Sequence, residues 1–157
     1  MTKLAGALDG IRILDLSRVL AGPSCTQLLG DLGADVLKVE RPGVGDETRT
    51  WGPPYLKNAS GSDTTESAYY LCCNRNKRSV TLDLKTGEGV ELLKRLCATA
   101  DVFVQNFRPG VVERLGIGEE AIRAVAPNIV YVSISGFGEN GPYAKKPTYD
   151  PIIQALS

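Results

Sequence analysis

The sequence contains no histidine among its 157 residues, and this absence excludes several kinds of catalytic site. A Ser-His-Asp triad, a Cys-His dyad and a histidine-ligated zinc ion each need an imidazole that this chain does not have. Any chemistry carried by these residues must therefore rest on carboxylates, thiols, lysines, tyrosines or backbone amides, or on residues from another chain.

An excess of charge and long hydrophobic runs are absent as well. Eighteen Lys and Arg residues balance 18 Asp and Glu residues, whereas a nucleic-acid-binding domain typically carries a basic excess. No run of about 18 uncharged apolar residues is present, and the first residues show no hydrophobic signal segment. We therefore predict a cytoplasmic protein that has no nucleic-acid or membrane partner.

The four cysteines include no Cys-x-x-Cys pair, which argues against a zinc ribbon or a thioredoxin-type motif and predicts no metal site. Free thiols also fit a reducing compartment. Cys25 and Cys97 fall within the apolar periodicity of helical segments. Because a free cysteine usually behaves as a small hydrophobic residue, we expect both of these side chains to be buried.

Short apolar segments alternate with helical segments along most of the chain. This alternation predicts an α/β fold with a Rossmann-like, doubly wound and mainly parallel sheet, which binds ligands at the carboxyl ends of its strands. Strands are predicted at residues 11–16, 35–40, 79–84, 101–106 and 129–135, and helices at about 23–32, 86–99, 109–115, 119–126 and from 151 onward.

Three of these elements carry more specific expectations. Thr86 is placed to cap the second helix, and an almost wholly apolar run predicts that the strand at 129–135 is buried within the sheet. The first helix is expected to bury an apolar face made of Cys25, Leu28, Leu29 and Leu32. The matching face of the second helix consists of Val90, Leu93, Cys97 and Ala100.

Residues 41–67 have a different composition, with four glycines, three prolines and little periodicity. This composition predicts a long loop, whose mobile part is expected at about residues 56–67. Loops of this length in compact domains are usually functional or disordered.

Two nucleotide-binding motifs are missing. No G-x-G-x-x-G fingerprint follows the first strand and no Walker A motif is present, which disfavours a dinucleotide-dependent oxidoreductase. Basic side chains nevertheless follow several strand ends. Each alone fits a solvated surface residue, but together they would suit a ligand with several phosphates. They are Arg41, Arg49, Lys77, Arg78, Lys85, Arg108 and Arg114.

Asp150 stands before Pro151 at the start of the last helical segment, and two interpretations of it stay open. It can cap the helix, because Asp is favoured at that position and Pro suits the first helical residue. Alternatively, its carboxylate faces the crevice at the strand ends and serves a function there.

Seven segments, taken in order, resemble one known family. They are Leu8 to Leu16, Ala21-Gly22-Pro23, Leu32 to Glu40, Asn76 to Ser79, Asp101 to Gly110, Gly136 to Pro142, and Tyr149-Asp150 with Gln154-Ala155. This set is similar to the class III CoA-transferases, the CaiB/BaiF type, from about residue 8 to residue 157. Within that family, residues 40–54 most resemble the succinyl-CoA:glutarate-type dicarboxylate CoA-transferases.

The resemblance implies that residues 1–157 are the N-terminal, Rossmann-like, CoA-binding part of a longer protein that forms an interlocked homodimer. It implies an enzyme that moves CoA from an acyl-CoA to a carboxylic acid, with acyl-CoA as a substrate and no permanently bound cofactor. In that chemistry an aspartate attacks the thioester and passes through an anhydride and an aspartyl-CoA. The nucleophile is expected beyond residue 157, so this chain alone is expected to be inactive.

Positions in the family motifs also imply which residues contact CoA. Arg41 is placed to bind phosphate, while Leu82, Phe107 and Leu115 are placed along the adenine or pantetheine path. Asp150 is implied to assist the nucleophile or to position the acceptor acid. The implied CoA contacts are Leu20, Ala21, Arg41, Leu82, Lys85, Asn106, Phe107, Arg114 and Leu115, with Lys146 substituting for a basic residue that relatives have at the position of Pro147.

Two alternatives remain open. The chain can be a non-catalytic CoA-binding fragment, because the nucleophile is not in it. It can also belong to a family member that acts as an acyl-CoA racemase or as a dehydratase component. Racemases of the family have a histidine where this sequence has Tyr149, so racemisation is disfavoured, since one half of the acid-base pair is absent.

Overall fold

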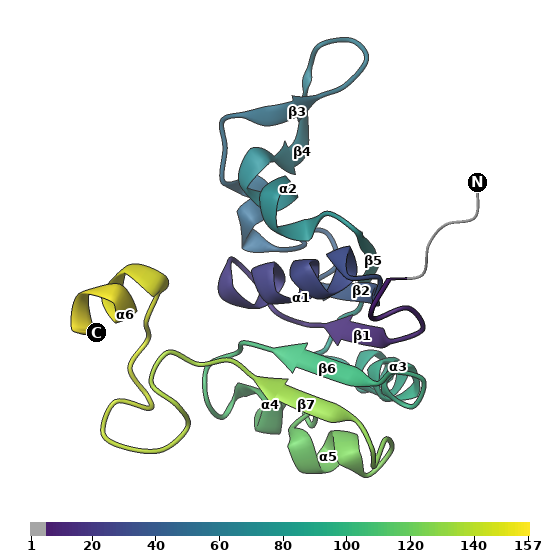
Figure 1. The fold of residues 1–157 in the computed structure, drawn as a ribbon, viewed down its shortest axis with the longest axis vertical. Helices are drawn as coiled ribbons and strands as arrows, with labels where there is room; N and C mark the ends of the chain where they lie inside the picture. The colour runs from purple at the N-terminus through teal and green to yellow at the C-terminus, as the bar shows by residue number, and fades with distance from the viewer. Residues whose placement is uncertain (1–5) are drawn as a thin grey trace.

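The computed structural model describes residues 6–157, and its centre is a five-stranded parallel sheet (Figure 1). The strands are β1 (Arg12–Asp15), β2 (Asp35–Glu40), β5 (Lys77–Thr81), β6 (Val102–Gln105) and β7 (Val130–Ser133). They lie in the order β5-β2-β1-β6-β7, and every neighbouring pair is parallel. The chain thus starts in the middle and winds outward in both directions, which confirms the predicted Rossmann-like fold.

Helices cover both faces of this sheet (Figure 1). On one face α1 (Ala21–Asp31) connects β1 to β2, and α2 (Ala68–Asn74) lies beside it. On the other face lie α3 (Gly87–Cys97), α4 (Val111–Arg114) and α5 (Glu119–Arg123). The last helix, α6 (Asp150–Leu156), stands away from the sheet and buries no side chain. No helix within residues 6–157 is long and apolar enough to cross a membrane.

The face under α3, α4 and α5 holds the larger apolar core. Phe103 of β6 is fully buried there and stacks on Tyr131 of β7, with ring centroids 4.9 Å apart. Thr86 caps α3 as predicted, because its Oγ1 accepts a hydrogen bond from Gly89 N at 3.0 Å. The buried members of this core are Leu14, Leu16, Val39, Leu93, Cys97, Phe103, Val112, Ile117, Ile122 and Ile129.

The apolar face predicted for the first helix is wrong for three of its four residues, and only Leu29 packs against the apolar core on that side of the sheet. Leu28 is 61% exposed, Leu32 is 50% exposed, and Cys25 is exposed as well, whereas Cys97 is buried as expected. The residues of α1 that turn inward are Gly22, Pro23, Thr26 and Gln27. They must be small or polar because the buried Asp15 of β1 lies beneath them and accepts a hydrogen bond from Thr26. The apolar periodicity predicted which residues share one face of the helix, but it did not predict which face packs against the sheet.

Residues 41–67 contain more regular structure than the predicted loop. They include a short 3₁₀ helix, η1 (Glu47–Thr50), and an antiparallel hairpin of β3 (Tyr55–Lys57) and β4 (Asp63–Ser67). The hairpin tip is closed by Asn58, whose Oδ1 accepts hydrogen bonds from the backbone N–H groups of Ser60 and Ser62. Strands this short give no readable alternation in the sequence. The mobility of residues 56–67 stays a prediction.

The strand predicted at 129–135 also differs from expectation. In the described part of the chain β7 pairs with β6 alone, so it forms an edge of the sheet, and Val130 is 57% exposed. An apolar run does not distinguish a central strand from an edge strand whose outer side lacks a neighbour.

Candidate functional site

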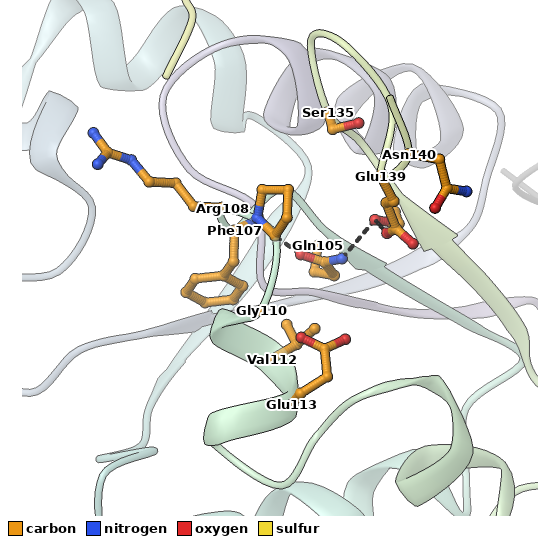
Figure 2. Close-up of a pocket in the computed structure, with 11 residues that line it drawn as sticks. Gln105, Phe107, Arg108, Gly110, Val112, Glu113, Ser135, Glu139 and Asn140 are labelled. Carbon is orange, nitrogen blue, oxygen red and sulfur yellow. Dashed lines mark hydrogen bonds between the residues drawn. The ribbon is translucent and has the colours of Figure 1, made fainter. Parts of the chain in front are cut away.

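A cavity of about 400 Å³ opens at the carboxyl ends of the central strands, where a doubly wound sheet binds its ligands. Its walls come from the turn after β1 (residues 18–21), the turn after β6 (106–109) and the segment from the end of β7 into α6. We call it the strand-end cavity. A second cavity of about 260 Å³, here called the α4 cavity, lies between the turn after β6, α4 and the loop after β7 (Figure 2).

Asn106 joins two walls of the strand-end cavity. Its Oδ1 accepts a hydrogen bond from Arg18 N at 2.9 Å, and its Nδ2 donates one to Arg18 O at 2.8 Å. The next residue, Val19, has a φ of 68°, a left-handed value that is costly for a β-branched residue. The Asn106 side chain therefore fixes a strained turn against the end of β6.

Arg18 places a cation at the same cavity. Its Nη1 lies 3.1 Å from Glu47 Oε1, and its guanidinium carbon lies 4.9 Å from the centre of the Phe107 ring. Stacking on an aromatic face limits the freedom of the guanidinium and leaves donors for an anionic ligand. Arg18 was not among the residues predicted for the site, although its place shortly after the first strand was a signal that could have identified it.

The structure brings together six of the predicted site residues. These six line the strand-end cavity: Leu20, Ala21, Asn106, Phe107, Lys146 and Asp150. The other five lie outside it. Arg41, Lys85 and Arg114 are exposed, and Leu82 and Leu115 pack against the larger apolar core. The contacts of ten of these residues with CoA, and the auxiliary role of Asp150, stay predictions.

Asp150 does not cap α6. The N-cap position belongs to Tyr149, no side chain caps the helix, and Asp150 is its first residue. Its carboxylate accepts a hydrogen bond from Gln154 one turn later and lies at the strand-end cavity. The capping interpretation is therefore wrong, and the functional interpretation stays open. Lys146, on the segment before α6, has its Nζ 4.0 Å from the centre of the Tyr143 ring.

Two buried ion pairs support the turn after β1 from below. Lys77 Nζ lies 3.0 Å from Asp15 Oδ2, and Lys38 Nζ lies 2.9 Å from Asp46 Oδ2, with each side chain at most 2% exposed. Lys38 Nζ also donates to Ser17 O at 2.8 Å, which anchors the backbone next to Arg18. Burial lowers the pKa of Lys77, and the carboxylate of Asp15 opposes this effect.

The Glu40 carboxylate, at the end of β2, is surrounded by donors. Arg49 donates to both of its oxygens at 2.8 Å, and Ser79 Oγ and Asp46 N donate at 2.6 and 2.8 Å. Burial alone would raise the pKa of Glu40, but these hydrogen bonds together lower it to about 2. Arg49 also forms an ion pair with Glu66 of β4 and donates a hydrogen bond to the hydroxyl of Tyr70 in α2. The network therefore connects the hairpin and α2 to the sheet.

These networks correct one expectation about the basic residues. Arg49 and Lys77 are satisfied by internal carboxylates, and Arg78 pairs with Asp35 on the surface. They therefore do not gather with the others around one crevice. Arg108 lines both cavities, and Figure 2 shows its side chain pointing away from the α4 cavity.

The site offers no metal centre in the part of the chain that the structure describes. No three side chains of Cys, Asp or Glu are grouped so as to hold an ion there. What the strand-end cavity offers is a concave wall of backbone, the aromatic ring of Phe107, three cations and two carboxylates. The cations are Arg18, Arg108 and Lys146, and the carboxylates are Glu47 and Asp150. These groups suit a flexible ligand that has both apolar and anionic parts.

Comparison with known proteins decides the family. The model of CoA-transferase family III matches residues 8–157. The chain belongs to this family. It is 51% identical over 150 residues to a human succinyl-CoA:glutarate CoA-transferase, a match that covers 96% of this chain and 33% of the human protein. A succinate–glutarate CoA-transferase of Agrobacterium fabrum is 49% identical, with coverage of 96% and 37%.

A solved structure of the family has the same fold. A CaiB/BaiF family protein from Brucella suis superimposes with a TM-score of 0.90 at 48% identity, over 97% of this chain and 39% of that protein. The predicted family, and its similarity to the succinyl-CoA:glutarate type, are confirmed. The chain spans about a third of the length of the curated relatives it matches.

Proposed function

We propose that the protein containing this chain is an enzyme that transfers coenzyme A between an acyl-CoA and a carboxylic acid, with a dicarboxylate as the preferred acid. The observation that carries this proposal is the strand-end cavity. Residues of the family motifs form part of its lining, in a chain about half identical to transferases named for succinyl-CoA and glutarate. Three cations, Arg18, Arg108 and Lys146, line that cavity and suit an acid with more than one carboxylate.

The CoA would lie along the carboxyl ends of the strands. Leu20, Ala21, Asn106 and Phe107 form the wall that the pantetheine arm would follow. The exposed side chains of Arg41, Lys85 and Arg114 remain available for phosphates, and Leu82 and Leu115 for the adenine. Acyl-CoA is in this scheme a substrate, and the protein has no resident cofactor.

The proposed reaction uses an aspartate nucleophile beyond residue 157. Its carboxylate attacks the thioester carbonyl, expels CoA thiolate and forms a mixed anhydride. The thiolate then attacks the aspartyl carbonyl, which gives aspartyl-CoA and releases the first acid. The acceptor acid attacks this thioester and the sequence runs in reverse, so that no atom is lost or oxidised. Asp150, at the edge of the cavity, would orient the acceptor acid.

The wider setting is also part of the proposal. Residues 1–157 would form the N-terminal CoA-binding part of a longer polypeptide, which assembles as an interlocked homodimer in the cytoplasm. The share of the relatives that this chain covers supports the first point. An intact-mass measurement on the native protein tests it, because a mass well above 16.8 kDa is expected.

The activity is tested with the protein at its natural length. Succinyl-CoA is supplied with glutarate, oxalate or the monocarboxylate butyrate. The acyl-CoA product is then separated, identified and quantified by mass spectrometry. We expect glutaryl-CoA at a rate at least tenfold above butyryl-CoA. Equal rates would contradict the preference for dicarboxylates. CoA binding without any transfer would favour a non-catalytic binding protein. Racemisation at the α-carbon of a chiral acyl-CoA would favour a racemase.

A further inference from the structure

A chain of side-chain hydrogen bonds crosses the end of the sheet and ends at the turn that carries Phe107 (Figure 2). Glu139, in the loop after β7, accepts a hydrogen bond from Ser133 Oγ at 2.6 Å. Ser133 Oγ accepts one from Gln105 Nε2 at 2.8 Å, and Gln105 Oε1 accepts one from Phe107 N at 2.8 Å. We call these three side chains the Glu139 relay. Gln105 is only 2% exposed, so its amide depends on protein partners.

The relay has one direction, which is fixed from both ends. The backbone N–H of Phe107 can only donate, so the carbonyl oxygen of the Gln105 amide faces it. The NH₂ group of Gln105 then faces Ser133, whose Oγ accepts from it and donates its single proton to the Glu139 carboxylate. Ser133 and Glu139 are exposed, whereas the Gln105 amide is buried. A carboxylate on the loop after β7 thus supports, through Ser133, the orientation of a buried amide on β6.

Phe107 is the point where the relay meets the strand-end cavity. Its ring lies under the guanidinium of Arg18, and its neighbour Asn106 clamps the backbone of Arg18. If the Gln105 amide turned over, its NH₂ group would face the N–H of Phe107, and two donors would oppose each other. The turn after β6 would lose its anchor and the Phe107 ring its fixed place over the cavity.

We propose that Glu139 is a positioning residue for CoA: through Ser133 and Gln105 it orients the Phe107 wall of the strand-end cavity without touching the ligand. This inference rests on the proposed function for its ligand, but the relay itself can be measured separately. The effect belongs to binding of the CoA moiety, so it acts on the KM for acyl-CoA and leaves the chemical step unchanged.

The test compares three variants of the protein at its natural length. Glu139→Ala removes the acceptor, Glu139→Gln retains an acceptor oxygen for Ser133, and Glu113→Ala removes a carboxylate from the same α4 cavity outside the relay. For Glu139→Ala we expect a KM for succinyl-CoA about fivefold higher, as for the loss of one hydrogen bond, with kcat within twofold and an unchanged melting temperature. The two other variants stay within twofold of the unsubstituted protein.

The hydrogen-exchange rate of the Phe107 backbone amide tests the relay without any substrate. In Glu139→Ala the Phe107 amide should exchange about fivefold faster, because its acceptor, the side-chain amide of Gln105, is no longer held through Ser133, while Glu139→Gln restores the slow rate. An unchanged KM and exchange rate in Glu139→Ala would overturn the proposal, and so would a Glu139→Gln variant as impaired as the alanine variant. If the unsubstituted protein neither binds nor transfers CoA, the proposed function fails and the exchange rates alone decide the relay.

Discussion

The two faces of the central sheet share every strand but are built from different side chains. Under α3, α4 and α5 the inward residues are apolar, among them Leu14, Leu16, Val39 and Phe103. Under α1 apolar and charged side chains share the same face of the sheet. The buried apolar residues there include Ile13, Val36 and Val104, and buried charged side chains lie among them. These are Asp15, Lys38, Glu40 and Lys77, which alternate with the apolar residues along the same strands.

The difference shows how one sheet can separate stability from site construction. Apolar packing on the α3 face stabilises the fold without needing a particular orientation of any polar group. Ion pairs on the α1 face cost desolvation, and their energy depends on geometry. They lie directly beneath the turn after β1 and the segment 41–50, and they hold backbone atoms at defined places, as Lys38 holds Ser17 O. We infer that this face fixes the shape of the strand-end cavity.

The largest expected effect comes from breaking one buried pair. Lys38→Met leaves the Asp46 carboxylate buried without its cation, so we expect a loss of about 3–5 kcal/mol in the free energy of unfolding. Urea denaturation measures it. The double variant with Asp46→Asn should recover more than half of this loss, since the amide oxygen still accepts from Thr48 N and position 46 no longer carries a charge. A loss below about 1 kcal/mol for Lys38→Met would show that the two faces do not differ as described.

A matched truncation on the apolar face should cost somewhat less. Leu93 of α3 is fully buried, so Leu93→Ala leaves a cavity in the core. We expect a loss of about 3 kcal/mol in the free energy of unfolding. Because no charge is involved, this loss should be the same at low and high salt and at pH 4 and 7. A marked dependence on either condition would contradict the separation of the two faces.

Acid should weaken the polar face selectively. The pKa of Glu40 is lowered from its ordinary value of 4.5 to about 2, so its contribution to stability is complete above about pH 4.5. It is lost as the pH falls toward 2, by about 1–3 kcal/mol for a carboxylate with charged hydrogen bonds. Stability measured from pH 6 to pH 3 should decline in the unsubstituted protein. In Glu40→Gln the decline should be smaller, and an identical decline would contradict the assignment.

The smallest effect concerns ligand binding instead of stability. Arg41 follows the buried Glu40 but is exposed, so Arg41→Ala should leave the melting temperature unchanged. If Arg41 binds a phosphate of CoA, the affinity measured by calorimetry on the protein at its natural length should fall about tenfold, or about 1.4 kcal/mol. Arg78→Ala, which removes an exposed arginine paired with Asp35, is the control and should bind CoA normally. Affinity unchanged within twofold for Arg41→Ala would remove Arg41 from the site.

The sequence predicted the fold well where the signals are local. The Thr86 cap and the buried face of α3 follow from a few neighbouring residues, and the structure has both. The burial of Lys38 and Glu40 could not be predicted in the same way. Their partners Asp46 and Arg49 come from a segment without periodicity, and only the folded chain brings them under the strand ends.

The site was predictable in part for a similar reason. Family motifs located Leu20, Ala21, Asn106 and Phe107, which the fold places around one cavity. The first helix was misjudged because its leucine stripe faces outward, over a sheet whose α1 side is polar. Arg18 was missed because its stacking on a ring 89 positions away is not encoded by a local pattern, which left its place after the first strand as the available signal.

The strand order also governs when the molecule can become stable during synthesis. β1 sits between β2, which follows soon after it, and β6. Just before β6, the side chain of Asp101 accepts a hydrogen bond from Arg12 N across 89 positions. Closing so long a loop is slow, and the cover for Leu14 and Leu16 includes α4 and α5, which come later still. A growing chain therefore exposes this apolar surface until residues beyond 120 have left the ribosome. During that interval the surface is open to binding by a chaperone.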